Sequence, residues 1–163
     1  MGKTSYVIAL GSNRRHHRHG DPRQVLEAAC DALESAGLAL VAASPVIRTD
    51  AIGPAGRAFA NGAIVVESTL APQAMIARLK AIERAFGRRP GRRWGPRVID
   101  LDIILWSGGL WAGDGLTIPH PGFRERRFVL DPLLAMVPDW RDPMTGLSVR
   151  HLHTRLARRR AAA

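Results

Sequence analysis

Cysteine, lysine and long apolar runs are scarce or missing in this sequence, and each absence narrows the class of protein. Cys30 is the single cysteine among 163 residues, so no disulfide can form within the chain, as expected in a reducing compartment. No apolar run approaches the ~18 residues of a membrane-spanning helix. The first residues lack the long apolar segment of a secretory signal. We therefore expect an unprocessed cytoplasmic protein without a membrane partner.

Lysine is nearly absent, because Lys3 and Lys80 are the only two among 24 basic residues. Arginine therefore supplies almost all of the net charge of +10. A protein this basic attracts polyanions such as nucleotides and nucleic acids, and the guanidinium group can bind phosphate through two parallel hydrogen bonds. A GC-rich genome would produce the same excess of alanine, glycine and arginine. The charge thus indicates an anionic partner without identifying it.

Two segments have the pattern of amphipathic helices. The first is the better defined, because Asp21 can cap it, Pro22 suits its first position and Gly37 can end it. The second begins at Pro72 and ends at Gly87.

Four segments with the composition of strands alternate with these helices, at residues 4–10, 38–49, 59–67 and 98–106. The resulting order, β-α-β-β-α-β, predicts an α+β protein with a ferredoxin-like core. We expect short strands near Leu110 and Leu116, a helix at 125–136 and a basic tail to follow this core. With no repeat and no long linker, residues 1–163 are predicted to form a single domain.

Two aspartates interrupt the last predicted strand, in the segment R-W-G-P-R-V-I-D-L-D-I-I-L-W. Asp100 and Asp102 are two residues apart, so their side chains share one face, whereas Ile99, Leu101 and Ile103 point to the other. Neighbouring carboxylates repel unless a cation lies between them. Two carboxylates completed by water and phosphate oxygens form a common Mg²⁺ site. A solvent-facing acid pair bonded to nearby arginines is the alternative.

Arginines flank the acid pair on both sides in the sequence: Arg88, Arg89, Arg92, Arg93 and Arg97 before it, and Arg124, Arg126 and Arg127 after it. A divalent ion between guanidinium groups suits a polyphosphate, although some of these arginines must simply be solvated. Neither G-x-x-x-x-G-K-[ST] nor G-x-G-x-x-G occurs. A bound nucleotide would therefore be held by metal and side chains.

Two phenylalanines and an amide are candidates for holding a flat ring. Phe59 opens a predicted strand, Asn61 follows on the same face, and Phe128 lies in R-R-F-V-L. Two phenyl faces and an amide can bind a heterocycle by stacking and hydrogen bonding. Ordinary core phenylalanines are the alternative.

Histidines occur in two contexts. His120, in L-T-I-P-H-P, could donate a hydrogen bond to a phosphate or cap a turn. His16, His17 and His19 have the composition of a metal-binding tract, but a solvated loop beside arginines explains them as well.

The run R-W-G-P-R-x-I-D-L-D-I, with A-L-G-S-N before it and L-T-I-P-H and R-x-F-V-L-x-P-L after it, resembles the 6-hydroxymethyl-7,8-dihydropterin pyrophosphokinases (HPPK) of folate biosynthesis. The resemblance extends over residues 6–138. It implies transfer of pyrophosphate from ATP to the hydroxymethyl group of the pterin, with release of AMP and with two Mg²⁺ ions bound. The implied partners are ATP and the pterin, with no nucleic acid and no membrane, and the implied state is a monomer.

The resemblance also implies roles for individual residues. Asp100 and Asp102 would hold the Mg²⁺ ions, and the catalytic residues would be Arg88, Arg97, Asp100 and Asp102. The pterin would be bound by Thr49, Asp50, Ile52, Phe59, Asn61, Trp94 and Phe128. ATP would be bound by Ile76, Glu83, Arg88, Arg97, Ile103, Thr117, His120 and Arg126. The segment 88–97, rich in arginine, glycine and proline, would be a loop that closes over the site.

Some positions depart from the family pattern. R-R-H-H-R-H replaces the usual Leu-Gly after Gly-Ser-Asn, and the loop before Phe59 is short. Pro121 replaces a frequent tyrosine, Gly115 stands where a basic residue is common, and Pro90 removes a possible loop arginine. These differences concern substrate affinity and loop motion more than the reaction.

Two other classes of function fit parts of the sequence. An RNA-binding domain of the RRM type would suit the predicted fold and charge, but the signature K/R-G-F/Y-G/A-F-V-x-F/Y is missing. A metal-dependent nuclease would use the same acid pair, although nothing else in the chain indicates hydrolysis.

Overall fold

The structure is a computed structural model that describes residues 2–14, 16–49, 58–87 and 98–162. Within these ranges the main sheet has five strands, all paired antiparallel. They are β1 (Thr4–Ser12), β2 (Ala39–Ala43), β3 (Ile47–Thr49), β4 (Phe59–Ser68) and β5 (Asp100–Trp106). The order is β2-β4-β1-β5, and the short β3 pairs with the beginning of β4. A separate hairpin is formed by β6 (Trp111–Gly113) and β7 (Leu116–Ile118).

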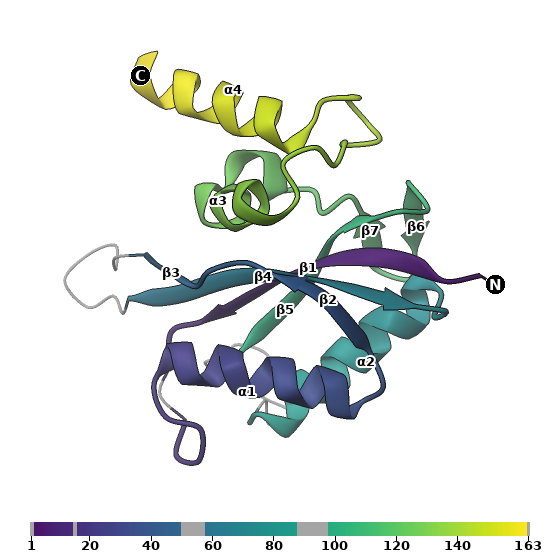
Figure 1. The fold of residues 1–163 in the computed structure, drawn as a ribbon, viewed down its shortest axis with the longest axis vertical. Helices are drawn as coiled ribbons and strands as arrows, with labels where there is room; N and C mark the ends of the chain where they lie inside the picture. Colours follow the sequence, from purple (N-terminus) through teal and green to yellow (C-terminus); the bar gives the residue numbers. More distant parts are fainter. Residues whose placement is uncertain (1, 15, 50–57, 88–97, 163) are drawn as a thin grey trace.

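Helices cover both faces of the main sheet (Figure 1). One face carries α1 (Pro22–Ser35) and α2 (Pro72–Ala85). The other face carries α3 (Arg127–Met136), which a short 3-10 turn, η1 (Phe123–Glu125), precedes, and α4 (Val149–Ala162) packs on α3. The protein is therefore a mixed α/β protein in which an antiparallel sheet lies between helical layers.

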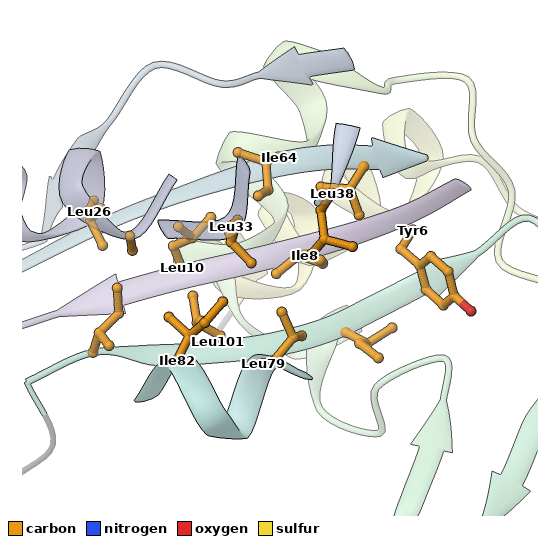
Figure 2. Packing of buried hydrophobic residues seen from close by; sticks show 14 of the residues in the cluster. Tyr6, Ile8, Leu10, Leu26, Leu33, Leu38, Ile64, Leu79, Ile82 and Leu101 are labelled. Atoms are coloured by element: carbon orange, nitrogen blue, oxygen red, sulfur yellow. The ribbon is translucent and has the colours of Figure 1, made fainter. Parts of the chain in front are cut away.

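The central strand β1 supplies side chains to both layers, because successive residues of a strand point to opposite faces. Tyr6, Ile8 and Leu10 belong to the core between the sheet and the first two helices, as Figure 2 shows. Val7 belongs to the core under α3, and Ala9 packs against that core. One strand thus connects two hydrophobic cores.

The start of α1 confirms the predicted helix cap. The Asp21 carboxylate accepts a hydrogen bond from the Gln24 N–H (2.9 Å), and the Gln24 side chain accepts one from the Asp21 N–H (2.9 Å). This reciprocal capping box satisfies two backbone donors that would otherwise lack partners. At the other end, Gly37 has φ +88°, a left-handed conformation that glycine adopts without strain.

Several element boundaries differ from the prediction. Residues 38–49 form two strands, because Pro45 has no N–H for a ladder bond and the Ser44 hydroxyl instead accepts from the Ala63 N–H (2.9 Å). β1 continues to Ser12, which pairs with β4. The helix expected from residue 125 begins as a 3-10 turn and becomes α-helical at Arg127.

The basic tail forms α4, which was not predicted. Val149, Leu152 and Leu156 recur at helical spacing and are buried in the core with α3. The helical spacing of these apolar residues was therefore present in the sequence, but arginines and histidines lie between them. In the described part of the chain, no helix is both long and apolar enough to span a bilayer.

A buried ion pair joins η1 to the segment between α3 and α4. The Asp142 side chain is fully buried and accepts two hydrogen bonds from the Arg124 guanidinium, at 2.5 and 2.8 Å. It also accepts hydrogen bonds from the Met144 N–H (3.0 Å) and the Thr145 hydroxyl (2.8 Å). Arg124 itself lies over the ring of the buried Phe123. This arrangement satisfies the carboxylate and fixes the segment that leads into α3.

We predict that Asp142→Ala lowers the free energy of unfolding by about 3 kcal/mol, because it removes one partner of a buried ion pair. Urea denaturation at pH 7 measures the loss. Asp139→Ala is the matched control, since its pair with Arg150 is exposed on both sides and should contribute less than about 1 kcal/mol. Equal losses in the two variants would contradict the assigned role of Asp142.

The same carboxylate gives stability a pH dependence. Burial would raise the pKa of Asp142, but hydrogen bonds from Arg124, Met144 and Thr145 outweigh burial and hold this pKa below its ordinary value. A depressed folded-state pKa contributes stability above the unfolded pKa of about 3.9 and loses it as pH falls through the folded value. Stability of the Asp142→Ala variant should therefore fall less steeply than that of wild type between about pH 4 and pH 2.

Candidate active site

A cavity of about 430 Å³ lies on the α3 face of the sheet, where β1 ends and β4 and β5 begin. Eight of the residues predicted from the sequence line it: Thr49, Phe59, Asn61, Asp100, Asp102, His120, Arg126 and Phe128. They come from segments that are far apart in the sequence and that the sheet brings to one place. Other lining residues, among them Ala9, Gly11, Ile104 and Val129, had not been predicted.

Cross-strand register arranges the cavity floor in two rows. Gly11 on β1 is opposite Asn61 on β4 and opposite Asp100 on β5. In the next row Ala9 is opposite Asp102. Residues directly opposite one another share a face, and adjacent strands are ~4.8 Å apart, so the backbones of Asn61 and Asp100 are roughly 10 Å apart. The amide and the acid pair therefore lie on either side of a strip of small residues on β1.

The acid pair occupies the cavity face of β5, as the alternation predicted. Asp100 and Asp102 are half-buried, whereas Ile99, Leu101 and Ile103 are almost completely buried on the other side. The two carboxylates thus point into a concave site and not onto an open surface. Two half-buried carboxylates on one face provide the hard oxygen ligands that Mg²⁺ prefers.

His120 contributes a fixed ring to the acid side of the cavity. The backbone N–H of His120 donates to the Ile104 carbonyl (3.0 Å), and the ring Nδ1 accepts from the Gly122 N–H (3.1 Å). Burial lowers the pKa of His120, while Asp102 raises it and Arg126 lowers it, with a net decrease. The ring is therefore neutral at pH 7, and with Nδ1 accepting, its proton is on Nε2. Such a ring can donate one hydrogen bond to an anionic ligand.

Phe59 and Phe128 are among the exposed large apolar side chains of the described residues, at 39% and 40%. Both line the cavity, and the Arg126 guanidinium lies 5.9 Å from the Phe128 ring centroid. The alternative that these are ordinary core residues is therefore wrong. Exposed aromatic faces in a concave site are suited to a flat ring.

Asn61 is buried, with 6% of its surface exposed, and its Nδ2 donates to the Thr49 hydroxyl (3.2 Å). Its amide group therefore has a defined direction at the floor of the cavity. A buried amide beside two exposed phenyl rings can form hydrogen bonds with the polar edge of a heterocycle.

Four predicted nucleotide contacts are not among the residues that line this cavity. Thr117 is exposed on the β6–β7 hairpin, and Ile76 is partly buried against the core of α1 and α2. Ile103 is buried in that same core. Glu83 is also buried on that side, and its Oε1 accepts from the Leu101 N–H and from Lys80 Nζ, both at 3.2 Å. Their contacts with ATP remain predictions.

Glu83 stabilises the backbone of the acid pair, because it accepts a hydrogen bond from the N–H of Leu101, which lies between Asp100 and Asp102. β5 is at the end of the described sheet, and Glu83 provides an acceptor for a backbone N–H on its outer edge. Burial raises the pKa of Glu83, although Lys80 and the Leu101 N–H oppose the shift. The sequence contained a signal for this burial, since Glu83 is four residues after Leu79 in the apolar stripe of α2.

We predict that Glu83→Ala lowers the free energy of unfolding by about 1–3 kcal/mol, because the buried Leu101 N–H loses its acceptor. Glu83→Gln keeps an oxygen acceptor and should stay within about 1 kcal/mol of wild type. Urea denaturation of both variants at pH 7 measures the difference. Equal destabilisation by alanine and glutamine would show that charge, and not the hydrogen bond to β5, is what matters.

The remaining predicted residues, Asp50, Ile52, Arg88, Trp94 and Arg97, lie outside the described residues. So does the predicted closing loop, 88–97, with its other arginines. Their roles stay predictions.

The histidine tract forms a stack of rings, with centroids 4.4 Å apart for His16–His17 and 4.6 Å for His16–His19. His19 also packs near Phe86, at 4.9 Å. Across the described ranges, no group of three or more His, Cys, Asp or Glu residues has an arrangement suited to a metal ion. The structure therefore gives no support to a metal site at this tract.

The cavity thus joins a slot for a flat ring to an acidic and basic cluster suited to a metal-bound polyphosphate. A known protein family matches most of the chain. The sequence profile of the 7,8-dihydro-6-hydroxymethylpterin-pyrophosphokinase (HPPK) family matches residues 7–138. The chain belongs to this family.

Individual relatives support the assignment. A Pseudomonas aeruginosa protein named 2-amino-4-hydroxy-6-hydroxymethyldihydropteridine pyrophosphokinase is 41% identical over 152 residues, which are 92% of this chain and 88% of that protein. A Methylorubrum extorquens protein of the same name is 37% identical over 138 residues, 83% of this chain and 84% of that one. The crystal structure of wild-type Plasmodium falciparum HPPK-DHPS matches with a TM-score of 0.76 at 15% identity, over 97% of this chain and 45% of that longer chain. At this identity the structural match concerns the fold alone.

Proposed function

We propose that this protein transfers pyrophosphate from ATP to the hydroxymethyl group of 6-hydroxymethyl-7,8-dihydropterin in folate biosynthesis. The observation that carries the proposal is the cavity itself, in which an aromatic and amide slot and an acid pair lie one strand apart. Family membership and the names of the relatives point to the same reaction. The fold alone would not, because one fold hosts many functions.

The pterin is assigned to the side of the cavity formed by β3, β4 and the start of α3. Phe59 and Phe128 offer exposed faces for its ring, and the buried Asn61 amide offers hydrogen bonds to its edge. The hydroxymethyl group then points from the β4 side of the cavity toward the acid pair on β5. This direction follows from the cross-strand row that joins Asn61, Gly11 and Asp100.

Two Mg²⁺ ions held by Asp100 and Asp102 are part of the proposal. The residues fit, because both carboxylates are half-buried and share the cavity face. When bound, Mg²⁺ neutralises phosphate charge and orients the polyphosphate. Arg126 and the Nε2–H of His120 add a cation and a neutral donor on the same side of the cavity.

The reaction requires alignment more than a strong base. The hydroxymethyl oxygen attacks the β-phosphorus, the bond from that phosphorus to the bridging oxygen of AMP breaks, and the hydroxyl proton is released. The protein contributes by holding the two substrates on opposite sides of β1 and by placing Arg126 and His120 near the transferred charge. No nucleophilic side chain is needed.

We also propose a core topology, a domain arrangement, an oligomeric state and a cellular location for this protein. The order β2-β4-β1-β5, with α1 and α2 on one face, supports a ferredoxin-like core. The continuous cores on both sides of β1 support one domain over residues 1–163. A cytoplasmic monomer that binds ATP and the pterin, and no nucleic acid, completes this description.

The direct test is to incubate the protein with Mg-ATP and 6-hydroxymethyl-7,8-dihydropterin and to separate the products by chromatography. We expect AMP and the pterin pyrophosphate in equal amounts. Formation of ADP, or nucleotide turnover that does not depend on the pterin, would refute the proposed reaction.

We predict that Asp100→Asn and Asp102→Asn each abolish turnover, because both remove negative charge where the Mg²⁺ ions are assigned. Thermal unfolding without metal should show melting temperatures within about 3 °C of wild type, since relief of carboxylate repulsion offsets lost contacts. Asp114→Asn, in the exposed turn of the β6–β7 hairpin, is the matched control and should retain activity. A large fall in melting temperature in both active-site variants would instead identify the acid pair as structural.

A further inference from the structure

Gly11 lies between the amide and the acid pair on the cavity floor. It lines the cavity and is directly opposite Asn61 on one neighbouring strand and Asp100 on the other. Glycine inside a strand weakens the strand, so its presence here calls for a local reason.

Close approach of the Asn61 side chain provides that reason. A Cβ atom at position 11 would lie 3.1 Å from Asn61 Oδ1, and among the described residues no other atom outside positions 10–12 would be within 4 Å of it. A contact this short requires the asparagine side chain to move. The acid pair on the other side of Gly11 would not be touched directly.

The Asn61 amide has little freedom to yield. Its Nδ2 donates to the Thr49 hydroxyl at 3.2 Å, and only 6% of the residue is exposed. The amide is therefore held at one end by Thr49, while its carbonyl oxygen occupies the space that a side chain at position 11 would need.

We propose that Gly11 is a specificity-determining residue of the pterin site, because its missing side chain allows the Asn61 carbonyl oxygen to lie beside β1 and accept a hydrogen bond from an N–H on the heterocycle edge. This inference rests on the proposed function. Gly11 acts through Asn61 and is a positioning residue. Its effect is confined to the heterocycle and does not extend to the nucleotide.

A second glycine offers a matched control on the same pair of strands. Gly62 follows Asn61 on β4 and pairs with Leu10. A Cβ at Gly62 would meet Ser44 Oγ at 3.6 Å and Val46 Cγ2 at 3.8 Å, which are ordinary contact distances. Glycine-to-alanine substitution at position 62 thus adds the same methyl group without displacing the amide.

The test measures the dissociation constants of 6-hydroxymethyl-7,8-dihydropterin and of a non-hydrolysable Mg-ATP analogue by calorimetry. Gly11→Ala should weaken pterin binding by about tenfold or more, the effect of losing one well-placed hydrogen bond. Binding of the ATP analogue should change by less than about twofold, because this substitution leaves the acid pair in place. Gly62→Ala should bind both ligands as wild type does.

A double mutant separates action through Asn61 from a general disturbance of β1. Asn61→Ala removes the atom that Gly11→Ala would contact, so the variant carrying both substitutions should bind the pterin no more weakly than Asn61→Ala alone. If Gly11→Ala alone fails to fold, the double variant should recover the melting temperature of Asn61→Ala.

Wild-type pterin affinity in Gly11→Ala, additive losses in the double mutant, or equal weakening of pterin and nucleotide would each overturn the inference while leaving the proposed function intact. No recovery of folding in the double variant would overturn it as well. Failure of the wild-type protein to bind the pterin would instead overturn the proposed function, and the inference with it.

Discussion

The alternation of side chains along β1 is the constraint on which both the fold and the cavity depend. Tyr6, Ile8 and Leu10 enter the core under α1 and α2, while the residues between them face α3 and the cavity. Because β1 is paired on both sides, its register fixes which residue of β4 lies in the same cross-strand row as which residue of β5. A shift of one residue would reverse both sets at once. The relative positions of the ring slot and the acid pair are therefore set by hydrophobic burial on the opposite face.

The acid side of the cavity is supported by groups that do not themselves enter it. Glu83 accepts a hydrogen bond from the backbone between the two aspartates, and Gly122 fixes the His120 ring through Nδ1. A neutral histidine and an arginine give the cavity hydrogen-bond donors without requiring a proton to be taken up near pH 7. Such support keeps polar groups in place where water would otherwise compete for them.

Sequence patterns predicted those parts of the site that depend on local chemistry. The spacing of Asp100 and Asp102 defined their shared face, and the position of Asn61 two residues after Phe59 placed both on one face of a strand. The role of Gly11 could not be predicted in this way, because a missing side chain matters only once its cross-strand neighbours are known. The hydrogen bond from the Leu101 N–H to Glu83 could not be predicted either, because it depends on how α2 packs against β5. The helix α4 was not predicted in the basic tail, because its few large apolar residues are separated by arginines and histidines.

The Arg124–Asp142 pair has a consequence for where the functional unit ends. The match to the family extends to residue 138, yet the carboxylate that fixes Arg124 comes after that point, and α4 follows it. Arg124 stands two residues before Arg126 and four before Phe128, both of which form the cavity wall. A boundary drawn at the end of the family match would thus remove Asp142, which holds Arg124 beside the cavity wall. The part of the chain that matches the family ends at residue 138, whereas the contacts that stabilise the cavity wall extend to Asp142.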